Sequence, residues 1–310
     1  MLFFVAYMVS TITYTQCPVC LKTDIKKIFS CKDYTVSKED FNIWECANCT
    51  LRFTQHVPDA SAIGKYYQSS DYISHSDTKK GIVNRLYHTI RNYTLKSKQS
   101  LVKEATGKEQ GDLLDIGAGT GAFAHTMQQS GWKVVGLEPD ETARKNALAT
   151  YNLLLDNPEK LYEFSADSFD ALTMWHVLEH VHDLHKYLQT FHSILKKDGS
   201  LVVAVPNYTS KDAKMYGEYW AAYDVPRHLY HFSPASMKVL LESEGFTLKE
   251  MKPMWFDSFY VSMLSEQYKG GSNLIKAVVN GLSSNFKAIG DKRRCSSVIY
   301  IAEKKKVTGA

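Results

Sequence analysis

A glycine-rich turn between a strand and a helix constrains the fold of this chain more than any other feature. It reads Leu113-Leu-Asp-Ile-Gly-Ala-Gly-Thr-Gly121, an apolar stretch followed by three glycines and a helical pattern. Glycines at such a turn let the backbone pass close to a ligand, and the first N–H groups of the helix point toward it. Glu138 ends the next predicted strand, where a carboxylate can accept both hydroxyls of a ribose.

Alternating strands and helices continue from this turn to the end of the chain. Asp140, Asp183 and Ser233-Pro234 mark helix starts, because their side chains can accept a hydrogen bond from the first turn. This order predicts an α/β fold, a mostly parallel sheet with helices on both faces, over residues 109–310. Apolar runs predict its strands at residues 112–116, 133–137, a weak 153–155, 169–175, 201–205 and 297–302. Asp198-Gly199 is read as the turn that leads into the fifth of these.

Two regions precede this domain, and two insertions interrupt it. Residues 1–60 contain the paired cysteines and short alternating stretches, which predict a small zinc-ribbon-like domain. Residues 61–108 are predicted to form a helical linker or cap. Insertions near residues 206–232 and 256–294 are predicted lids, since long segments beside a binding edge commonly carry function.

Four of the six cysteines form two pairs with metal-ligand spacing, Cys17-Pro-Val-Cys20 and Cys46-Ala-Asn-Cys49. Two such pairs supply four thiolates in a tetrahedron, the arrangement of structural Zn²⁺ sites, and leave no open position for catalysis. Redox-active or unligated thiols are the alternative. The other two cysteines, Cys31 and Cys295, are expected to be packing residues.

The glycine turn alone leaves the ligand open, because it also fits a dinucleotide fingerprint and hence an NAD(P)-dependent oxidoreductase. Three further features favour another reading: Asp115 two residues before the first glycine, Trp175-His-Val-Leu-Glu-His-Val181, and Leu195-Lys-Lys-Asp-Gly-Ser-Leu-Val-Val203. Together, in this order, they resemble the motifs of class I S-adenosylmethionine-dependent methyltransferases. The resemblance covers roughly residues 110 to 250.

This resemblance implies a Rossmann-like sheet with an antiparallel last strand, and S-adenosylmethionine as the cofactor. It places Gly117, Ala118 and Gly119 against the methionine moiety, and Glu138 on the ribose. The full set of candidate cofactor residues is Asp115, Gly117, Ala118, Gly119, Glu138, Pro139 on the adenine, Asp156 or Asn157 at its edge, His176, Tyr66 and Tyr72.

The N-terminal region adds a weaker resemblance. Cysteine pairs followed by Tyr66-Tyr67 and Tyr72 are similar to methyltransferases with an N-terminal zinc-binding domain, some of which act on nucleotide-linked sugars and on cell-surface or natural-product precursors. In that case Tyr66 and Tyr72 close over the cofactor; alternatively, they pack the cysteine-rich region against the sheet.

Candidate catalytic residues are histidines, because methyl transfer to a hydroxyl needs a base with a pKa near neutrality. His228, His231 and Arg227 lie in the aromatic insertion after the fifth strand, and His180 follows the fourth. Their alternative role is structural, capping helix ends or joining a hydrogen-bond network. His182 and His185 are expected to face solvent.

Composition sets the limits of these readings. A net charge of +4 with 23% charged residues and no basic stripe does not suggest nucleic acid, and no window approaches the roughly 18 apolar residues of a membrane span. Residues 1–9 are read as a first strand or an over-long start rather than an export signal. We therefore expect a cytoplasmic methyltransferase for a small-molecule or carrier-linked acceptor, a sugar or lipid precursor, with oligomeric state open. A non-catalytic zinc-containing interaction protein is the remaining alternative.

Overall fold

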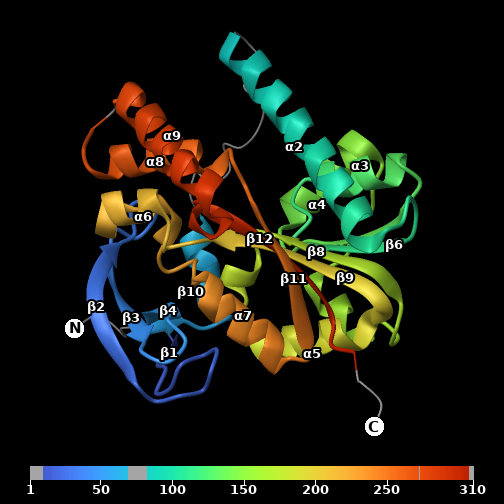
Figure 1. The fold of residues 1–310 in the computed structure, drawn as a ribbon, viewed down its shortest axis with the longest axis horizontal. Coiled ribbons are helices and arrows are strands. Elements are labelled where there is room, and N and C mark those ends of the chain that lie inside the picture. Colours follow the sequence, from blue (N-terminus) through green and yellow to red (C-terminus); the bar gives the residue numbers. More distant parts are fainter. Residues whose placement is uncertain (1–9, 69–81, 272, 307–310) are drawn as a thin grey trace, which may run out of the picture.

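The computed structural model describes residues 10–68, 82–271 and 273–306, without the side chains of residues 82–89. Figure 1 shows a small sheet near the N-terminus beside a larger sheet flanked by helices. The strands are β1 (Thr11–Ile12), β2 (Ile25–Lys32), β3 (Asp40–Cys46), β4 (Arg52–Gln55), β5 (Val57–Pro58), β6 (Asp112–Ile116), β7 (Lys133–Leu137), β8 (Phe169–Trp175), β9 (Leu195–Pro206), β10 (Tyr230–His231), β11 (Phe246–Pro253) and β12 (Ser297–Lys304). The α-helices are α2 (Ile82–Thr106), α3 (Ala122–Gln129), α4 (Glu141–Tyr151), α5 (Leu184–Ile194), α6 (Lys211–Tyr216), α7 (Pro234–Ser243), α8 (Asp257–Tyr268) and α9 (Leu274–Gly290).

The larger sheet has six strands in the order β11-β12-β9-β8-β6-β7. Strands β7, β6, β8 and β9 pair in parallel, and β12 is antiparallel to both of its neighbours. The predicted mostly parallel sheet with an antiparallel last strand is therefore confirmed. Three predicted strands, at residues 112–116, 133–137 and 169–175, have the bounds that the structure gives them.

Successive side chains of the parallel strands enter different cores, so both faces of the sheet are covered. Leu113 packs with Val102 of α2 and Phe123 of α3. Its neighbour Leu114 belongs to the main core, which includes Leu188 of α5 and apolar residues of α7. Figure 1 shows α2 and α3 on one side of the sheet and α5 and α7 on the other.

The predicted helix starts are confirmed by their caps. The Asp140 side chain accepts a hydrogen bond from the Thr142 N–H, and that of Asp183 accepts one from Lys186. Ser233 forms a capping box with Ser236, followed by a proline at the first helical position.

Two local predictions are wrong. The third strand is reduced to one bridge between Asp156 and Leu137, because only that residue reaches hydrogen-bonding distance of β7. Asp198-Gly199 is not a turn between two elements. It lies within β9, where the partners of Phe169 and Ala171 are Leu195 and Ser200, so the residues between these two bulge out of the ladder.

The smaller sheet has the order β10-β4-β3-β2, and its edge strand β10 belongs to the insertion at residues 206–232. The insertion is therefore not an exposed flap. It continues through α6 and two short 3₁₀ turns, Gly217–Tyr219 and Ala221–Tyr223, and buries Trp220, Tyr223 and Phe232 almost completely. This pairing joins the cysteine-rich region to the larger sheet.

The insertion at residues 256–294 forms the hairpin of α8 and α9 between β11 and β12. In Figure 1 this hairpin lies at the opposite end of the small sheet from β1. Among the described residues, no helix combines the length and apolarity needed to cross a membrane.

Candidate cofactor, acceptor and metal sites

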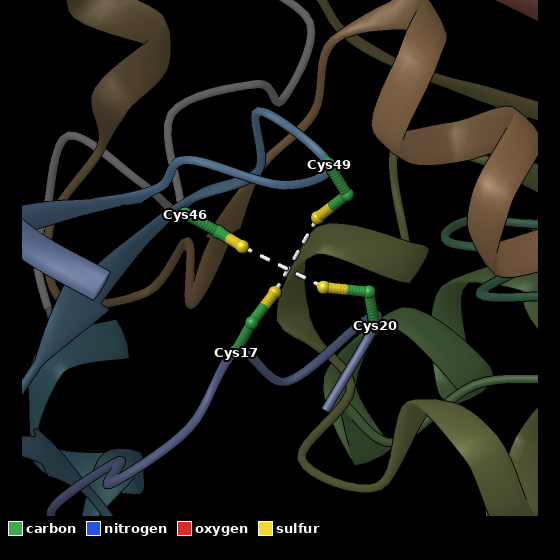
Figure 2. Close-up of side chains that lie close together, drawn as sticks. All are labelled: Cys17, Cys20, Cys46 and Cys49. Atoms are coloured by element: carbon green, nitrogen blue, oxygen red, sulfur yellow. Dashed lines mark hydrogen bonds between the residues drawn. The ribbon is translucent and has the colours of Figure 1, made fainter. Parts of the chain in front are cut away.

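The four paired cysteines come together in the small sheet (Figure 2). Their sulfur atoms all lie within 4.8 Å of one another, with 3.5 Å between Cys17 and Cys49 and 3.5 Å between Cys20 and Cys46. The Val19 N–H points at the Cys17 sulfur from 3.4 Å. The hydrogen bond from Cys49 lowers the pKa of the Cys17 thiol to about 5. Four converging, largely buried sulfurs fit a tetrahedral Zn²⁺, whose Zn–S distance is about 2.3 Å.

The glycine turn requires glycine at its first position. Gly117 has φ +69°, and a Cβ there would lie 2.3 Å from Val177 Cγ2. Gly119 also has a positive φ, +55°, but no atom lies within 4 Å of the position of its Cβ. The turn is therefore tightly packed beneath Gly117 and open above Gly119, which leaves room for a ligand to approach the backbone.

Glu138 faces this turn from the end of β7. One carboxylate oxygen accepts a hydrogen bond of 2.7 Å from the Gly119 N–H, and the other accepts one of 2.9 Å from Asp140. Burial raises the pKa of this carboxyl, which is 8% exposed. Each oxygen keeps a second lone pair, so the carboxylate can still accept ribose hydroxyls.

Asp115 lies beneath the turn rather than in the open space. Its carboxyl is 1% exposed and accepts a hydrogen bond of 2.7 Å from the Thr173 hydroxyl on β8. Burial raises its pKa to about 7. Asp115 thus fixes the turn to the neighbouring strand.

The other candidates for cofactor contact separate into two groups. Pro139 and Asn157 follow β7 and the Asp156 bridge, at the same sheet edge as Glu138. The Asp156 carboxylate pairs with Lys160 at 2.8 Å. Tyr66 lies elsewhere: it is 3% exposed, and its hydroxyl donates to Glu39.

Tyr66 belongs to an apolar cluster that contains Phe41 of the small sheet and Trp220 of the insertion, so its contacts are those of a packing residue. Tyr72 lies outside the described residues. The neighbouring residue Tyr67 reaches the candidate catalytic residues instead: its hydroxyl is 3.0 Å from Nδ1 of His180. Two adjacent tyrosines cannot be told apart by composition, and only the 3₁₀ turn Ile63–Tyr67 determines which of them faces the histidine.

His176 sits between two carboxylates. Its Nε2 is 2.8 Å from Asp257 at the start of α8, and its Nδ1 is 3.3 Å from Glu179. Burial disfavours the imidazolium, but these carboxylates outweigh it and raise the pKa of His176 to about 10. His176 is therefore a cation at neutral pH, and Asp257 was not identified from the sequence because it is distant in the chain.

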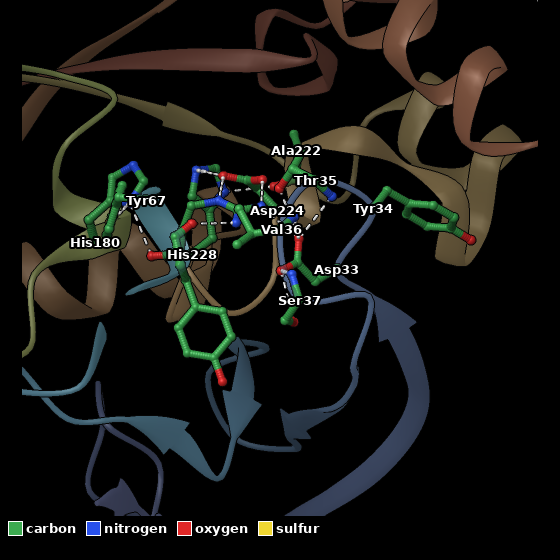
Figure 3. Close-up of polar contacts among 12 residues, drawn as sticks. Asp33, Tyr34, Thr35, Val36, Ser37, Tyr67, His180, Ala222, Asp224 and His228 are labelled. Atoms are coloured by element: carbon green, nitrogen blue, oxygen red, sulfur yellow. Dashed lines mark hydrogen bonds and ion pairs between the residues drawn. The ribbon is translucent and has the colours of Figure 1, made fainter. Parts of the chain in front are cut away.

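His180 has the opposite environment. Burial lowers the pKa of His180 to about 4, and a proton on the neighbouring His228 ring adds to this lowering. Its Nδ1 lies 3.0 Å from the carbonyl oxygen of Arg227, and its ring meets that of His228 edge-on at 4.6 Å (Figure 3). At neutral pH this ring is uncharged.

His228 completes the pair. Its Nδ1–H donates to the Ala222 carbonyl at 2.8 Å, which leaves Nε2 as the acceptor nitrogen of the neutral ring. Ligand atoms of Glu179, His180 and His228 lie within 4.8 Å of one another. One oxygen of Glu179 is buried without a hydrogen-bond partner among the described residues. The cluster can therefore accept a proton or ligate a cation.

Arg227 and His231 are interior residues in this structure. The guanidinium, 1% exposed, bonds to both oxygens of Asp224, to Asp33 and to the Tyr66 carbonyl. His231 is 2% exposed on β10, with Nε2 3.1 Å from the Thr54 hydroxyl. Both side chains join the small sheet to the insertion, and this corresponds to the structural role that the sequence allowed.

Residues 87–250, more than half of the chain, match the family described as "Methyltransferase domain". The human mitochondrial ubiquinone biosynthesis O-methyltransferase is 28% identical over 164 residues, which cover 47% of this chain and 44% of that protein. The enzyme of that name from Haemophilus ducreyi is also 28% identical, over 47% of this chain and 69% of its own length.

The chain thus spans less than half the length of the human relative. A solved methyltransferase from Archaeoglobus fulgidus aligns with 70% of this chain and 100% of its own at 21% identity and a TM-score of 0.44. The glycine turn, the strand order and the family match over residues 87–250 agree, and the chain belongs to the class I S-adenosylmethionine-dependent methyltransferases.

Proposed function

We propose that this chain transfers the methyl group of S-adenosylmethionine to a small-molecule or carrier-linked acceptor, a sugar or lipid precursor. The observation that carries the proposal is the paired geometry of the glycine turn and Glu138. The turn is open above Gly119, and the carboxylate faces it from the next strand. Both features suit a nucleoside with a ribose and a flexible amino-acid tail.

In this proposal Glu138 accepts the ribose hydroxyls, and Gly117, Ala118 and Gly119 run beside the methionine moiety. Pro139 covers the adenine, and Asp156 or Asn157 contacts its edge. His176, cationic between its two carboxylates, fixes the segment that follows β8 and thereby orients Glu179 and His180.

His228 is the proposed general base, and His180 holds its ring edge-on. When bound, S-adenosylmethionine supplies the methyl group, whose bond to sulfur breaks as the bond to the acceptor forms. The acceptor hydroxyl gives its proton to Nε2 of His228, the nitrogen that does not contact Ala222 and that lies 3.9 Å from an oxygen of Asp224. Arg227 acts as a positioning residue, because its contacts hold the backbone on which His228 sits.

The names of the relatives support a small acceptor. The human and Haemophilus ducreyi proteins are named as O-methyltransferases of ubiquinone biosynthesis. A hydroxyl acceptor suits a neutral histidine base, since oxygen must lose its proton during transfer.

We further propose that the four-cysteine cluster holds a structural Zn²⁺. The four sulfurs leave no position for substrate, so the ion would stabilise the small sheet rather than take part in methyl transfer. None of the six cysteines forms a disulfide, which supports a reducing compartment such as the cytoplasm.

The test is isothermal titration of the full chain with S-adenosylhomocysteine and, separately, with NAD. Binding of S-adenosylhomocysteine alone supports the proposal. Binding of NAD alone would support an NAD(P)-dependent oxidoreductase instead, and binding of neither ligand by folded protein would favour a non-catalytic role.

Once an acceptor is found, His228→Ala should lower turnover about 10²-fold or more while leaving cofactor affinity unchanged. His56→Ala, an exposed histidine, is the matched control.

A further inference from the structure

Helix α9 presents its large apolar side chains to solvent and its small ones to the protein. Seven of the fifteen large exposed hydrophobic residues in the described chain belong to this helix. At about 100° per residue, all seven project within an arc of roughly 140°. They are Leu274, Ile275, Val278, Val279, Leu282, Phe286 and Ile289, with exposed fractions from 44% to 79%.

The opposite side of α9 is the one that packs. Its buried residues are small or polar: Ala277, Asn280, Gly281, Ser284 and Ala288. Asn280 donates to the Tyr216 hydroxyl at 2.8 Å, and a Cβ at Gly281 would lie 2.8 Å from a ring carbon of Phe259. These contacts fix the orientation of α9 on the protein, so its apolar side faces solvent and not the core.

Positive charge lies along one side of this apolar face. Residues 269–294 contain six lysines and arginines and a single acid, Asp291. Lys276, Lys292 and the two arginines form ion pairs with Glu266, Glu250 and Asp291, whereas no ion pair of Lys269 or Lys287 is found among the described residues. Lys287 is exposed beside Phe286, and together these two residues line a shallow groove between α6 and α9. Trp255 adds an exposed aromatic ring next to the helix, since its carbonyl accepts a hydrogen bond of 2.8 Å from Asn285.

We propose that the face formed by α9, Trp255 and the adjacent lysines Lys211 and Lys287 docks the protein on an anionic lipid surface. The helix lies in the plane of the membrane interface, with Ile275 and Phe286 among the acyl chains and the lysines among the phosphates. Seventeen residues with two lysines suit this position, since a span needs about 20 predominantly apolar residues.

Charge complementarity favours lipid over a second copy of this chain. Two copies paired through α9 would bring the lysines of one helix toward those of the other, and none of the seventeen residues of the helix is acidic. The surface also adjoins the candidate site: Asp257, the first residue of α8, holds His176 at 2.8 Å. Docking through the hairpin would therefore bring the acceptor site near the membrane.

The experiment is flotation of the full chain with vesicles of phosphatidylglycerol and phosphatidylcholine at about one to two, and with phosphatidylcholine alone. The protein should float with the anionic vesicles and lose binding as salt is raised. The double variant Ile275→Glu, Phe286→Glu should bind about a hundredfold more weakly, since each buried apolar side chain contributes about tenfold. Leu154→Glu, which alters a residue 77% exposed against 79% for Ile275, should bind like the wild type.

Equal binding by the double variant, or no binding by folded wild type, would overturn the proposal. Phe286→Trp provides a second readout that leaves the fold intact: its emission should shift to shorter wavelength with anionic vesicles only. If the wild type is a dimer in lipid-free solution and the double variant is a monomer, the face binds a second copy of the chain and the lipid proposal is overturned. S-adenosylhomocysteine titration of each variant separates a failure of docking from a failure of the methyltransferase proposal.

Discussion

The small sheet and the large sheet of this protein are stabilised in different ways. In the large sheet, six consecutive residues of β8 and eight of β9 are buried, and most of them are apolar; the polar ones are Asp170, Thr173 and Ser200. The small sheet also buries apolar residues such as Ile43 and Phe53, but adds cysteines and charged or polar side chains such as Asp33 and Gln55. Apolar burial dominates in the large sheet, whereas the small sheet depends in addition on specific polar contacts and sulfur.

This difference teaches where each region is vulnerable. Apolar packing tolerates a change of similar volume, whereas a buried charge that loses its partner is strongly destabilising. The small sheet also depends on β10, a strand contributed by the insertion after β9. We therefore expect single substitutions of polar or cysteine residues to destabilise the small sheet and to leave the large sheet intact.

The largest expected effect is that of Cys17→Ser. If the cluster holds Zn²⁺, the variant loses the ion and a large share of the roughly 10 kcal/mol or more that zinc contributes to small zinc domains. Metal analysis should give one zinc per wild-type chain and none in the variant, with hydrogen exchange increased across β2 to β4 but not across β6 to β9. Cys31→Ser, a buried thiol outside the cluster, should keep its zinc.

Arg227→Met should have the next largest effect. It leaves the buried carboxylate of Asp33 and the partly buried carboxylate of Asp224 without their cation, which is destabilising by about 3–5 kcal/mol. Denaturant unfolding measures the change, and Arg227→Lys should recover part of it. Unchanged stability with lost turnover would instead make Arg227 a substrate-facing residue and would remove it from the contacts of the small sheet.

These contacts also show what the sequence could predict. Features with local signals were correct: the glycine turn, the capping residues Asp140 and Asp183, and the strands at residues 112–116, 133–137 and 169–175. The cysteine spacing predicted a cluster that the structure assembles. Each of these depends on residues that are close in the chain or on a motif whose geometry is fixed.

Long-range contacts had no such signal. Tertiary packing determines that His231 pairs with β4 and that Asp257 contacts His176. It also determines that Tyr67, and not Tyr66, contacts His180. The weak third strand failed for the same reason, because a short apolar run becomes a strand only where a neighbour accepts its full ladder. Asp156 alone met that condition.

Glu138→Gln tests the large sheet at its open edge. The variant keeps the size of the side chain but loses its charge and one of its two acceptor oxygens, so affinity for S-adenosylhomocysteine should fall by about 10- to 100-fold, or 1.5–3 kcal/mol. Stability should fall by no more than about 1–3 kcal/mol, the effect of losing the hydrogen bond from Gly119 or Asp140, since the apolar core is untouched. Glu141→Gln, an exposed glutamate on α4, is the control and should bind normally. Unchanged affinity for Glu138→Gln would remove this residue from the site.

The smallest effect concerns a polar contact at the edge of the large sheet, that of His176 with Asp257 and Glu179. His176 has its pKa raised from 6.5 to about 10 by Asp257 and Glu179, so it binds its proton more tightly in the folded state. Its contribution to stability is therefore complete below pH 6.5 and is lost as the pH rises through 10.

The free energy of unfolding of wild type should exceed that of His176→Gln by on the order of 1–2 kcal/mol at low pH, the value of a hydrogen bond to a charged group. The difference between the two free energies of unfolding should narrow toward pH 10. A difference that is constant with pH would mean that His176 acts by packing alone. In that case apolar contacts would hold the insertion after β11 against the large sheet, as they hold the strands of that sheet together. The contrast between the two sheets would then extend to the edge of the candidate site.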